Sequence, residues 1–368
     1  MVTNIDISAY KRDSAFYGDL NLVLTVKSFD LQAIRQRYIK SRGGKTGKTG
    51  SVERRAISLG GLVSLSIQKG KINNERILAK LKEPRGIALS EKYVGISSEN
   101  EAYIIEVGGK LTHLKDPWFS YIHTLDFSKD QRRILISSSG FDVIMEYDIS
   151  TLEKTYEWWA WENGFDQGFD AKTGKAITIS RNEDNRGKDG FHIVADPTQD
   201  SLPTAMRAAF INSVVYDSVE PNKLLATFFH EGKVMQIDQE NGKSVPVVSG
   251  LKNPHGGDRY GSSYIGTSTG TGFVALSNEE EVTQFDFSKL QGKPDFLAGM
   301  EWLQNSKNIG PNIITIDSNR NQFVIFNPKL KLIDTIGYND NWAVQDMITG
   351  TLSEQQEQQI IALNDPAN

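Results

Sequence analysis

The strongest constraint on the fold is a repeat of short β-strand patterns separated by turn residues. Segments rich in Val, Ile, Thr, Tyr and Phe, bounded by Gly, Asn and Asp, recur along most of the chain, and such segments are typical of strands. Each copy has a polar or Gly start, a short strand, a second strand that ends in Ser or Thr, and an apolar third strand. Copies begin about 40–50 residues apart, which is the period of four-stranded propeller blades. Their first residues lie near Arg85, His123, Gln167, Asn212, His255 and Gln304.

The two ends of the chain supply the parts of one more blade. The repeat places another innermost strand at 341–347, where little sequence remains for the rest of its blade. The segments 20–28, 62–68 and 75–83 provide outer strands without a polar start. Joining the ends removes open sheet edges, which otherwise invite aggregation. We therefore predict an all-β fold, a single seven-bladed β-propeller over 1–368, closed by pairing of N- and C-terminal strands in one blade.

The copy at Gln167 is the most divergent, and six or eight blades result if it is misread. A pair of β-sandwiches and an irregular β solenoid are the wider alternatives. Helical patterns are limited to 31–40 and to a short tail at 352–362. The segment 41–55 is rich in Gly, Lys and Arg, and we predict that it is a flexible basic insertion.

Charge and composition narrow the possible partners. The net charge of −5 argues against a nucleic-acid binder, which usually has a basic face. The chain has no cysteine, so neither disulfides nor thiolate chemistry are available. No run approaches the ~18 apolar residues of a membrane span, and residues 1–14 lack the apolar core of a secretory signal. We expect a cytoplasmic protein that binds a small molecule, with no nucleic acid and no membrane as partner.

Propeller geometry gathers polar residues at one end of the central channel. The turn before each innermost strand and the turn between the second and third strands lie on the same face, which we call the channel mouth. The predicted catalytic residues there are His255, His123, Arg320 and Glu301. The predicted substrate-binding residues are Arg85, Gln167, Asn212, Trp302, Gln304 and Trp342.

Two kinds of chemistry fit these side chains. Neutral imidazoles with a carboxylate are common ligands of Zn²⁺ and related cations, so His123, His230 and His255, with Glu301, would hold a divalent metal (Zn, Ca or Mg). Without a metal, a histidine near its ordinary pKa of ~6.5 acts as general acid or base. An arginine such as Arg85 then clamps an anionic substrate in two parallel hydrogen bonds. Structural roles are the alternative, because histidines and tryptophans also pack between blades.

The segment 253–256 (Asn-Pro-His-Gly) resembles the Pro-His-Gly turn of streptogramin lyases and peptidylamidoglycolate lyases, which are propellers. The resemblance implies that His255 lines the channel and that a divalent metal takes part in substrate cleavage. His123 has a corresponding position but lacks the Pro and Gly, and the Gly-Asn-Trp or Gly-Ala-Trp strand pattern of these families is missing. Arylsulfotransferases are similar only in blade layout.

The leading hypothesis is therefore an enzyme that acts on a small polar or anionic molecule at the channel mouth, by lyase, hydrolase or group-transfer chemistry. The rival hypothesis is a non-catalytic scaffold that binds a protein or peptide across the same face, since many propellers are scaffolds.

Overall fold

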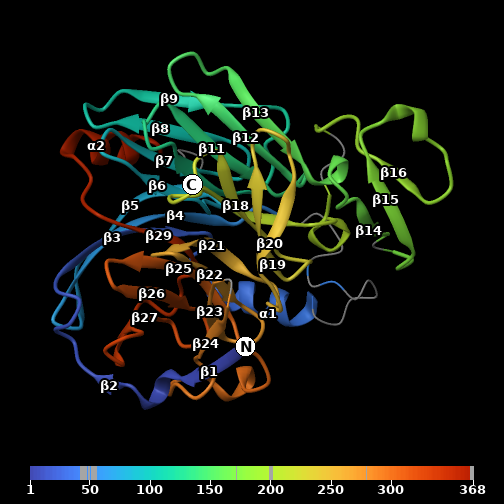
Figure 1. Cartoon of the computed structure of the whole chain (residues 1–368). Helices are drawn as coiled ribbons and strands as arrows, with labels where there is room; N and C mark the ends of the chain where they lie inside the picture. The colour runs from blue at the N-terminus through green and yellow to red at the C-terminus, as the bar shows by residue number, and fades with distance from the viewer. Residues whose placement is uncertain are drawn as a thin grey trace.

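Short antiparallel sheets dominate the structure, a computed structural model that describes residues 1–41, 48, 50, 56–170, 172–198, 202–278 and 280–364. Seven sheets form within these residues. In six of them the innermost strands contact one another in cyclic order around a central channel. Figure 1 shows these sheets packed into one body. The innermost strands are β6 (Ile87–Leu89), β10 (Ile122–Phe127), β17 (Ile211–Tyr216), β21 (His255–Tyr260), β25 (Leu303–Ile309) and β29 (Val344–Thr349).

Each of these six sheets continues outward as an antiparallel meander. The second strands are β7 (Tyr93–Ser97), β11 (Arg133–Ser138), β18 (Lys223–Phe228), β22 (Ser263–Ser268), β26 (Asn312–Asp317) and β3 (Leu20–Val26). The third strands are β8 (Ala102–Glu106), β12 (Val143–Asp148), β19 (Lys233–Asp238), β23 (Phe273–Ser277), β27 (Gln322–Asn327) and β4 (Leu59–Gln68). The outer strands are β9 (Leu111–Leu114), β13 (Lys154–Trp159), β20 (Ser244–Val248), β24 (Val282–Asp286), β28 (Leu332–Gly337) and β5 (Lys71–Lys82).

A belt of six hydroxyl groups fixes the innermost strands, within a blade or across to the next one. Each second strand places one fully buried Ser or Thr near its end, where its hydroxyl bonds to an innermost strand or to the residues just before one. Such bonds satisfy backbone and side-chain groups that burial would otherwise leave without partners. The Ser or Thr ending noted in the repeat therefore has a structural cause. The belt consists of Thr25, Ser97, Ser137, Thr227, Thr267 and Thr315.

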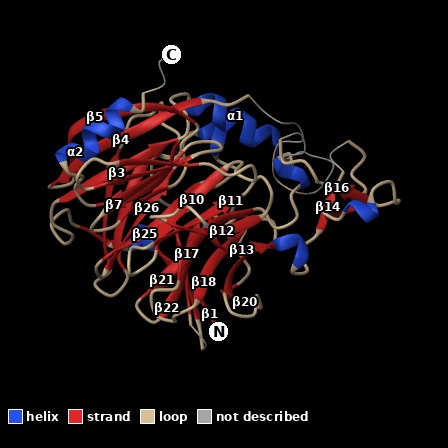
Figure 2. Cartoon of the chain, turned by 90° about the horizontal axis from the view of Figure 1, so that it is seen from above, coloured by secondary structure: helices blue, strands red, loops and turns tan. Residues whose placement is uncertain are grey.

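The predicted count of seven blades is not confirmed, because the copy at Gln167 forms no blade of the ring. Its three short strands are β14 (Gln167–Phe169), β15 (Ala176–Ser180) and β16 (Phe191–Ile193), and β16 pairs with β15 in parallel. Figures 1 and 2 show this sheet projecting from the body. The ring passes directly from β10 to β17. Only a short strand and a turn matched the repeat at this position, and neither the parallel pair nor the missing fourth strand allows a blade.

The two ends of the chain meet in one blade, where β29 pairs antiparallel with β3. Two N-terminal strands also extend other blades. β1 (Val2–Asp6) adds in parallel to β24, and β2 (Lys11–Arg12) adds in parallel to β28. Both outer edges are thereby covered.

Two α-helices lie where helical patterns were predicted. α1 spans Leu31–Ser41, and α2 spans Glu354–Ala362 behind a capping box at Ser353. The predicted insertion at 41–55 lies largely outside the described residues. Short 3₁₀ turns complete the elements: η1 (Ile7–Ala9), η2 (Ala160–Glu162), η3 (Glu183–Asn185), η4 (Thr204–Met206) and η5 (Asp295–Leu297). Within the described part of the chain, neither helix has the length and apolar character needed to cross a membrane.

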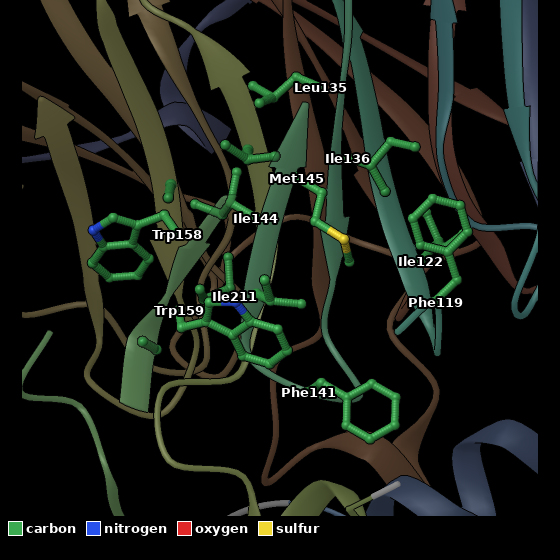
Figure 3. Close-up of a cluster of buried hydrophobic side chains, with 14 of the residues drawn as sticks. Phe119, Ile122, Leu135, Ile136, Phe141, Ile144, Met145, Trp158, Trp159 and Ile211 are labelled. Atoms are coloured by element: carbon green, nitrogen blue, oxygen red, sulfur yellow. The ribbon is translucent and has the colours of Figure 1, made fainter. Parts of the chain in front are cut away.

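Apolar side chains fill the spaces between blades. In the largest cluster, Trp158 and Trp159 of β13 pack with Met145 of β12 and Ile211 of β17 (Figure 3). Burying side chains of this size contributes about 1.5–3 kcal/mol each. Rigid blades therefore hold the innermost strands, and with them the channel lining, in place.

Candidate functional site

Four blades turn their first channel residue inward by the same backbone device. Glu83, Tyr121, Phe210 and Asn253 have φ between 40° and 52°, a left-handed conformation that is uncommon outside glycine. Each lies two residues before a side chain at the channel mouth, namely Arg85, His123, Asn212 and His255 respectively. Such strained residues cost about 1–3 kcal/mol each and cluster at functional sites. The same backbone conformation thus recurs at the same repeat position in four blades, next to the residues of the channel mouth.

Bulges near the start of the innermost strands place more of their side chains in the channel. The pairing register shifts just after Ile122, Ile211, His255, Leu303 and Val344. A bulge inserts one residue and re-aims the side chains that follow. A residue at the mouth and a residue three positions later therefore both face the channel, and the lining has two levels.

The first level, the mouth layer, consists of Arg85, His123, Arg207, Asn212 and His255. The guanidinium carbons of Arg85 and Arg207 lie over the Tyr121 ring, 4.8 and 4.4 Å from its centroid. Both arginines are buried. Arg85 is also ion-paired with Glu83, while Arg207 Nε donates to the Leu202 carbonyl at 3.2 Å. Two buried arginines thus contact the same aromatic ring, and such contacts strengthen when water is excluded.

The histidines of the mouth are held neutral. Burial, followed by the charges of Arg85, His255 and Arg207, lowers the pKa of His123 well below its ordinary value. Burial, with Lys27, lowers the pKa of His255 to about 3. His123 Nδ1 donates to the Tyr121 carbonyl at 2.9 Å, which fixes its tautomer. We predicted that both histidines act as acid or base at their ordinary pKa. In this environment, the pKa of each histidine is lower than that.

Asn212 contributes an unsatisfied acceptor to the mouth layer. Its amide nitrogen donates to the Pro254 carbonyl at 2.9 Å. Its Oδ1 is buried and has no hydrogen-bond partner among the described residues. A buried polar atom without a partner is costly, so this oxygen is a contact point for a ligand donor or a water.

The second level, the acid layer, consists of Asp126, Asp258, Lys307 and Asp346 on β10, β21, β25 and β29. Lys307 Nζ lies 3.6 Å from Asp346 Oδ1. Burial, with the charge of Asp258 adding to it, raises the pKa of Asp126 to about 7. Burial alone would lower the pKa of Lys307, but the three carboxylates outweigh it and the pKa is raised. The four side chains belong to innermost strands of one ring, three of them three residues beyond a predicted mouth residue and the fourth beside Lys307, and we therefore treat them as one level.

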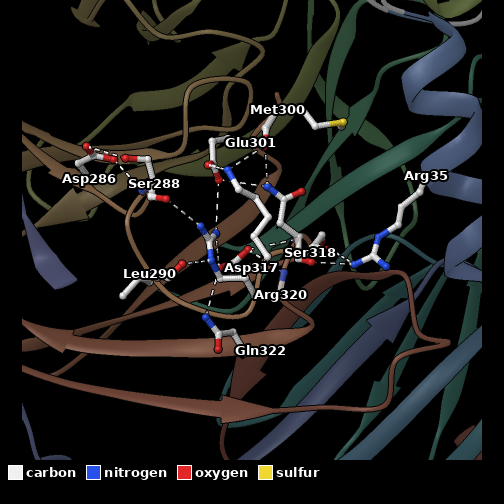
Figure 4. Close-up of polar contacts among 12 residues, drawn as sticks. Arg35, Asp286, Ser288, Leu290, Met300, Glu301, Asp317, Ser318, Arg320 and Gln322 are labelled. Atoms are coloured by element: carbon white, nitrogen blue, oxygen red, sulfur yellow. Dashed lines mark hydrogen bonds and ion pairs between the residues drawn. The ribbon is translucent and has the colours of Figure 1, made fainter. Parts of the chain in front are cut away.

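Arg320 and Glu301 lie outside both layers, in a network that uses every guanidinium nitrogen of Arg320 (Figure 4). Arg320 Nε donates to the Leu290 carbonyl at 2.9 Å, and Nη2 donates to the Ser288 carbonyl at 3.2 Å. Nη1 reaches Asp317 at 3.0 Å and Glu301 at 3.4 Å. All three guanidinium nitrogens are thus used inside the protein, which is a structural role and not the predicted catalytic one.

Three other predicted site residues also lie elsewhere. Gln167 is exposed on the projecting sheet, because the strand that carries it is not innermost. Trp302 stacks on Tyr38 of α1 at 4.9 Å between ring centroids. Trp342 is buried in a core cluster and meets Phe29 edge-on. Neither tryptophan face is available to line a pocket.

Gln304 does lie at the start of an innermost strand. Its Oε1 accepts a hydrogen bond from Gln345 Nε2 of the neighbouring strand at 3.3 Å. The two amides continue the mouth layer around the ring.

The three histidines predicted to hold a metal are separated by aromatic rings. Phe210 contacts both His123 and His230, and Phe229 contacts both His230 and His255. His230 Nε2 donates to the Thr204 carbonyl at 2.9 Å. Among the described residues, no group of three or more His, Asp or Glu side chains is placed to hold a metal ion.

Sequence reasoning missed Arg207 and the acid layer. Arg207 follows η4 in the stretch that was assigned to an extra blade, so no repeat position pointed to it. Asp126, Asp258 and Lys307 each lie three residues after a predicted mouth residue, His123, His255 and Gln304. That constant spacing is a signal that a deeper reading of the repeat would have found.

Comparison with known proteins places the chain by fold alone. No protein-family model and no curated protein matches it. A crystal structure of a nidogen/laminin complex is similar with 12% identity and a TM-score of 0.55, over 91% of this chain and 100% of that chain. A protein of unknown function from Bacteroides caccae is similar with 10% identity and a TM-score of 0.53, over 90% and 99%. A streptogramin B lyase aligns at 14% identity and a TM-score of 0.41, over 70% and 83%. An alignment at this TM-score carries no argument, so the resemblance to the streptogramin lyases stays a prediction.

Proposed function

We propose that this propeller binds a small anionic molecule in the mouth layer and acts on it by lyase, hydrolase or group-transfer chemistry. The observation that supports the proposal best is that Arg85 and Arg207 both contact the buried Tyr121 ring and both lower the pKa of the neighbouring His123. Arginines recognise carboxylates and phosphates through paired hydrogen bonds. The buried Oδ1 of Asn212 adds an acceptor for a hydroxyl or amine on the same ligand.

Binding of an anion would also prepare the histidines for chemistry. The charges of Arg85 and Arg207 are among the causes that lower the pKa of His123. A bound anion offsets these charges, so the pKa of His123 rises when the ligand is present. The histidine then moves towards the range in which proton transfer is efficient near neutral pH. The proposal needs no metal, although a metal brought by the substrate is compatible with it.

Titration with inorganic phosphate and with hexanoate tests the proposal. The affinity of the wild-type protein for each anion is measured by calorimetry and compared with that of Arg207→Met. We expect binding to weaken at least about tenfold in the variant, which corresponds to ~1.4 kcal/mol. The same titration followed by NMR of the imidazole nitrogens should show the pKa of His123 rising on binding.

Arg181→Met is the matched control. Arg181 also stacks on an aromatic ring, 3.7 Å from the centroid of Trp159, but it lies outside the channel. Its substitution removes one positive charge, as Arg207→Met does. The control should bind both anions like the wild type. Equal affinity of all three proteins, or no binding by the wild type, would contradict the proposal.

A further inference from the structure

The acid layer carries more negative than positive charge. It has three carboxylates and one ammonium group, and that ammonium lies beside Asp346. Asp126 and Asp258 form no ion pair within the described residues. Asp126 accepts hydrogen bonds from the backbone of Tyr216 and Phe127, and Asp258 accepts one from the backbone of Arg259. Both side chains are partly withdrawn from water, where a carboxylate is favoured by a nearby cation, so a second positive charge beside Lys307 would stabilise the layer.

A second, independent observation at the same place is the side chain of Asn305. It is 5% exposed, and its Nδ2 donates to Asp346 Oδ1 at 2.6 Å. Its Oδ1 has no hydrogen-bond partner among the described residues. A Cβ on Gly256 would lie 1.7 Å from this oxygen, so the oxygen faces β21 between His255 and Asp258. Only glycine at 256 leaves room for it.

Asn305 therefore holds an unused acceptor beside Gly256 of β21, on the same side chain that contacts Asp346 of the acid layer. An amide oxygen and carboxylates without cations accept hydrogen bonds and do not donate them. They match an ammonium group, which has three donors and no acceptor. They do not match a second anion, and they do not form a set that would hold a metal ion.

The spacing of the layers sets the length of a ligand that touches both. A strand rises about 3.3 Å per residue, but a bulge lies between the two layers, and β22 advances only two residues, from Thr267 to Ile265, while β21 runs from His255 to Asp258. The layers are therefore separated by roughly 7 Å along the strand. An α-amino acid carries its two charges on neighbouring carbons and is too short for this span. A linear molecule with several bonds between its charges fits better.

We propose that the acid layer binds the ammonium end of the same molecule whose anionic end is bound by the mouth layer. The substrate class is then a linear zwitterion, such as an ω-amino acid or a short peptide, lying along the channel axis. The inference rests on the proposed function, because the mouth layer must hold the anionic end. It adds Asp126, Asp258 and Asn305 as residues that determine specificity.

The test compares 6-aminohexanoate with hexanoate, which differ only by the ammonium group. We expect the wild type to bind 6-aminohexanoate at least about tenfold more tightly. The double variant with Asp126→Asn and Asp258→Asn should lose this preference, measured as the ratio of the two affinities in the same protein. Asparagine keeps an oxygen acceptor for the backbone N–H groups, so the variant retains these hydrogen bonds. Asp196→Asn, at an exposed turn, is the control and should keep the preference.

A shorter pair of probes, together with the hexanoate result, separates failure of this inference from failure of the proposed function. Glycine should bind no better than acetate, because it cannot reach both layers. If hexanoate binds and Arg207→Met weakens it, but the ammonium group brings no advantage, this inference is wrong and the anion site stands. If neither probe binds the wild type, the proposed function fails first and the inference with it. A preference that persists in the double variant would also overturn the inference.

Discussion

The channel and the network around Arg320 both contain buried arginines and carboxylates, yet they differ in how completely these groups are satisfied. Around Arg320, every guanidinium nitrogen is hydrogen-bonded within the protein. In the channel, Asn212 and Asn305 keep acceptors without partners among the described residues, and three carboxylates share the single ammonium group of Lys307. Saturation marks a group that stabilises the fold. A buried group that can still accept a hydrogen bond or a charge partner is a candidate ligand contact.

The largest effect on stability should come from removing the Arg320 guanidinium. Arg320→Met leaves Asp317 and Glu301 buried beside no guanidinium, and removing one partner of such a network costs about 3–5 kcal/mol. We expect a strongly lowered melting temperature in differential scanning calorimetry. Hexanoate affinity, measured well below that temperature, should be unchanged. A stable variant with reduced affinity would reverse the assignment of the two regions.

A channel carboxylate should behave in the opposite way. Burial raises the pKa of Asp126 from its ordinary 3.8 to about 7, so between these values the folded protein holds a proton that the unfolded chain has released. The free energy of unfolding therefore falls as the pH rises through this window and stays lowered above it. Asp126→Asn removes this penalty. Denaturation should show it equal to the wild type near pH ~4 and more stable by about 1–3 kcal/mol near pH ~8. Destabilisation at every pH would show that the carboxylate is needed as the acceptor for Tyr216.

Removing a mouth histidine should reduce binding more than stability. His255 is half-buried, and its Nδ1 lies 2.8 Å from Thr269 Oγ1. We expect His255→Ala to bind hexanoate about tenfold more weakly, with a small change in melting temperature. His113→Ala is the matched control. His113 lies on the outer strand β9, where it pairs with Glu101, so this variant should bind hexanoate like the wild type. Equal affinities of both variants and the wild type would remove His255 from the site.

The smallest effect is expected on the projecting sheet. Gln167 is exposed, and its Nε2 donates to Asp166 and Thr178. Gln167→Ala should change stability by less than about 0.5 kcal/mol and leave anion binding unchanged in the same calorimetric titration. Lost binding would mean that this sheet contributes to the mouth after all.

The sequence predicted the all-β fold and the meeting of the chain ends because strand periodicity and repeat length are local properties. It misjudged the segment 166–194, because a short strand followed by a turn resembles the start of a blade and only tertiary contacts show that it lies outside the ring. The parallel pairing of β15 with β16 has no local signature.

Part of the site could be predicted and part could not. Arg85, His123, Asn212 and His255 follow from the repeat position alone. Arg320 occupies an equivalent turn, but its direction is set by carbonyls of residues 288 and 290 from a neighbouring blade, which no spacing reveals. The lowered pKa of His123 arises from burial and from the charges of Arg85, His255 and Arg207, and that of His255 arises from burial and Lys27. These causes depend on the assembled ring.

The pairing of β29 with β3 has a consequence for how the protein folds. Asp346 N donates to Thr25 Oγ1 across 321 positions of the chain. During synthesis, β3 therefore leaves the ribosome long before its partner strand β29. Contacts of such sequence separation form slowly, because chain entropy must be lost before they add stability. We expect completion of this blade to limit the folding rate. Until then, β3 presents an open edge on which a chaperone or a second nascent chain would act.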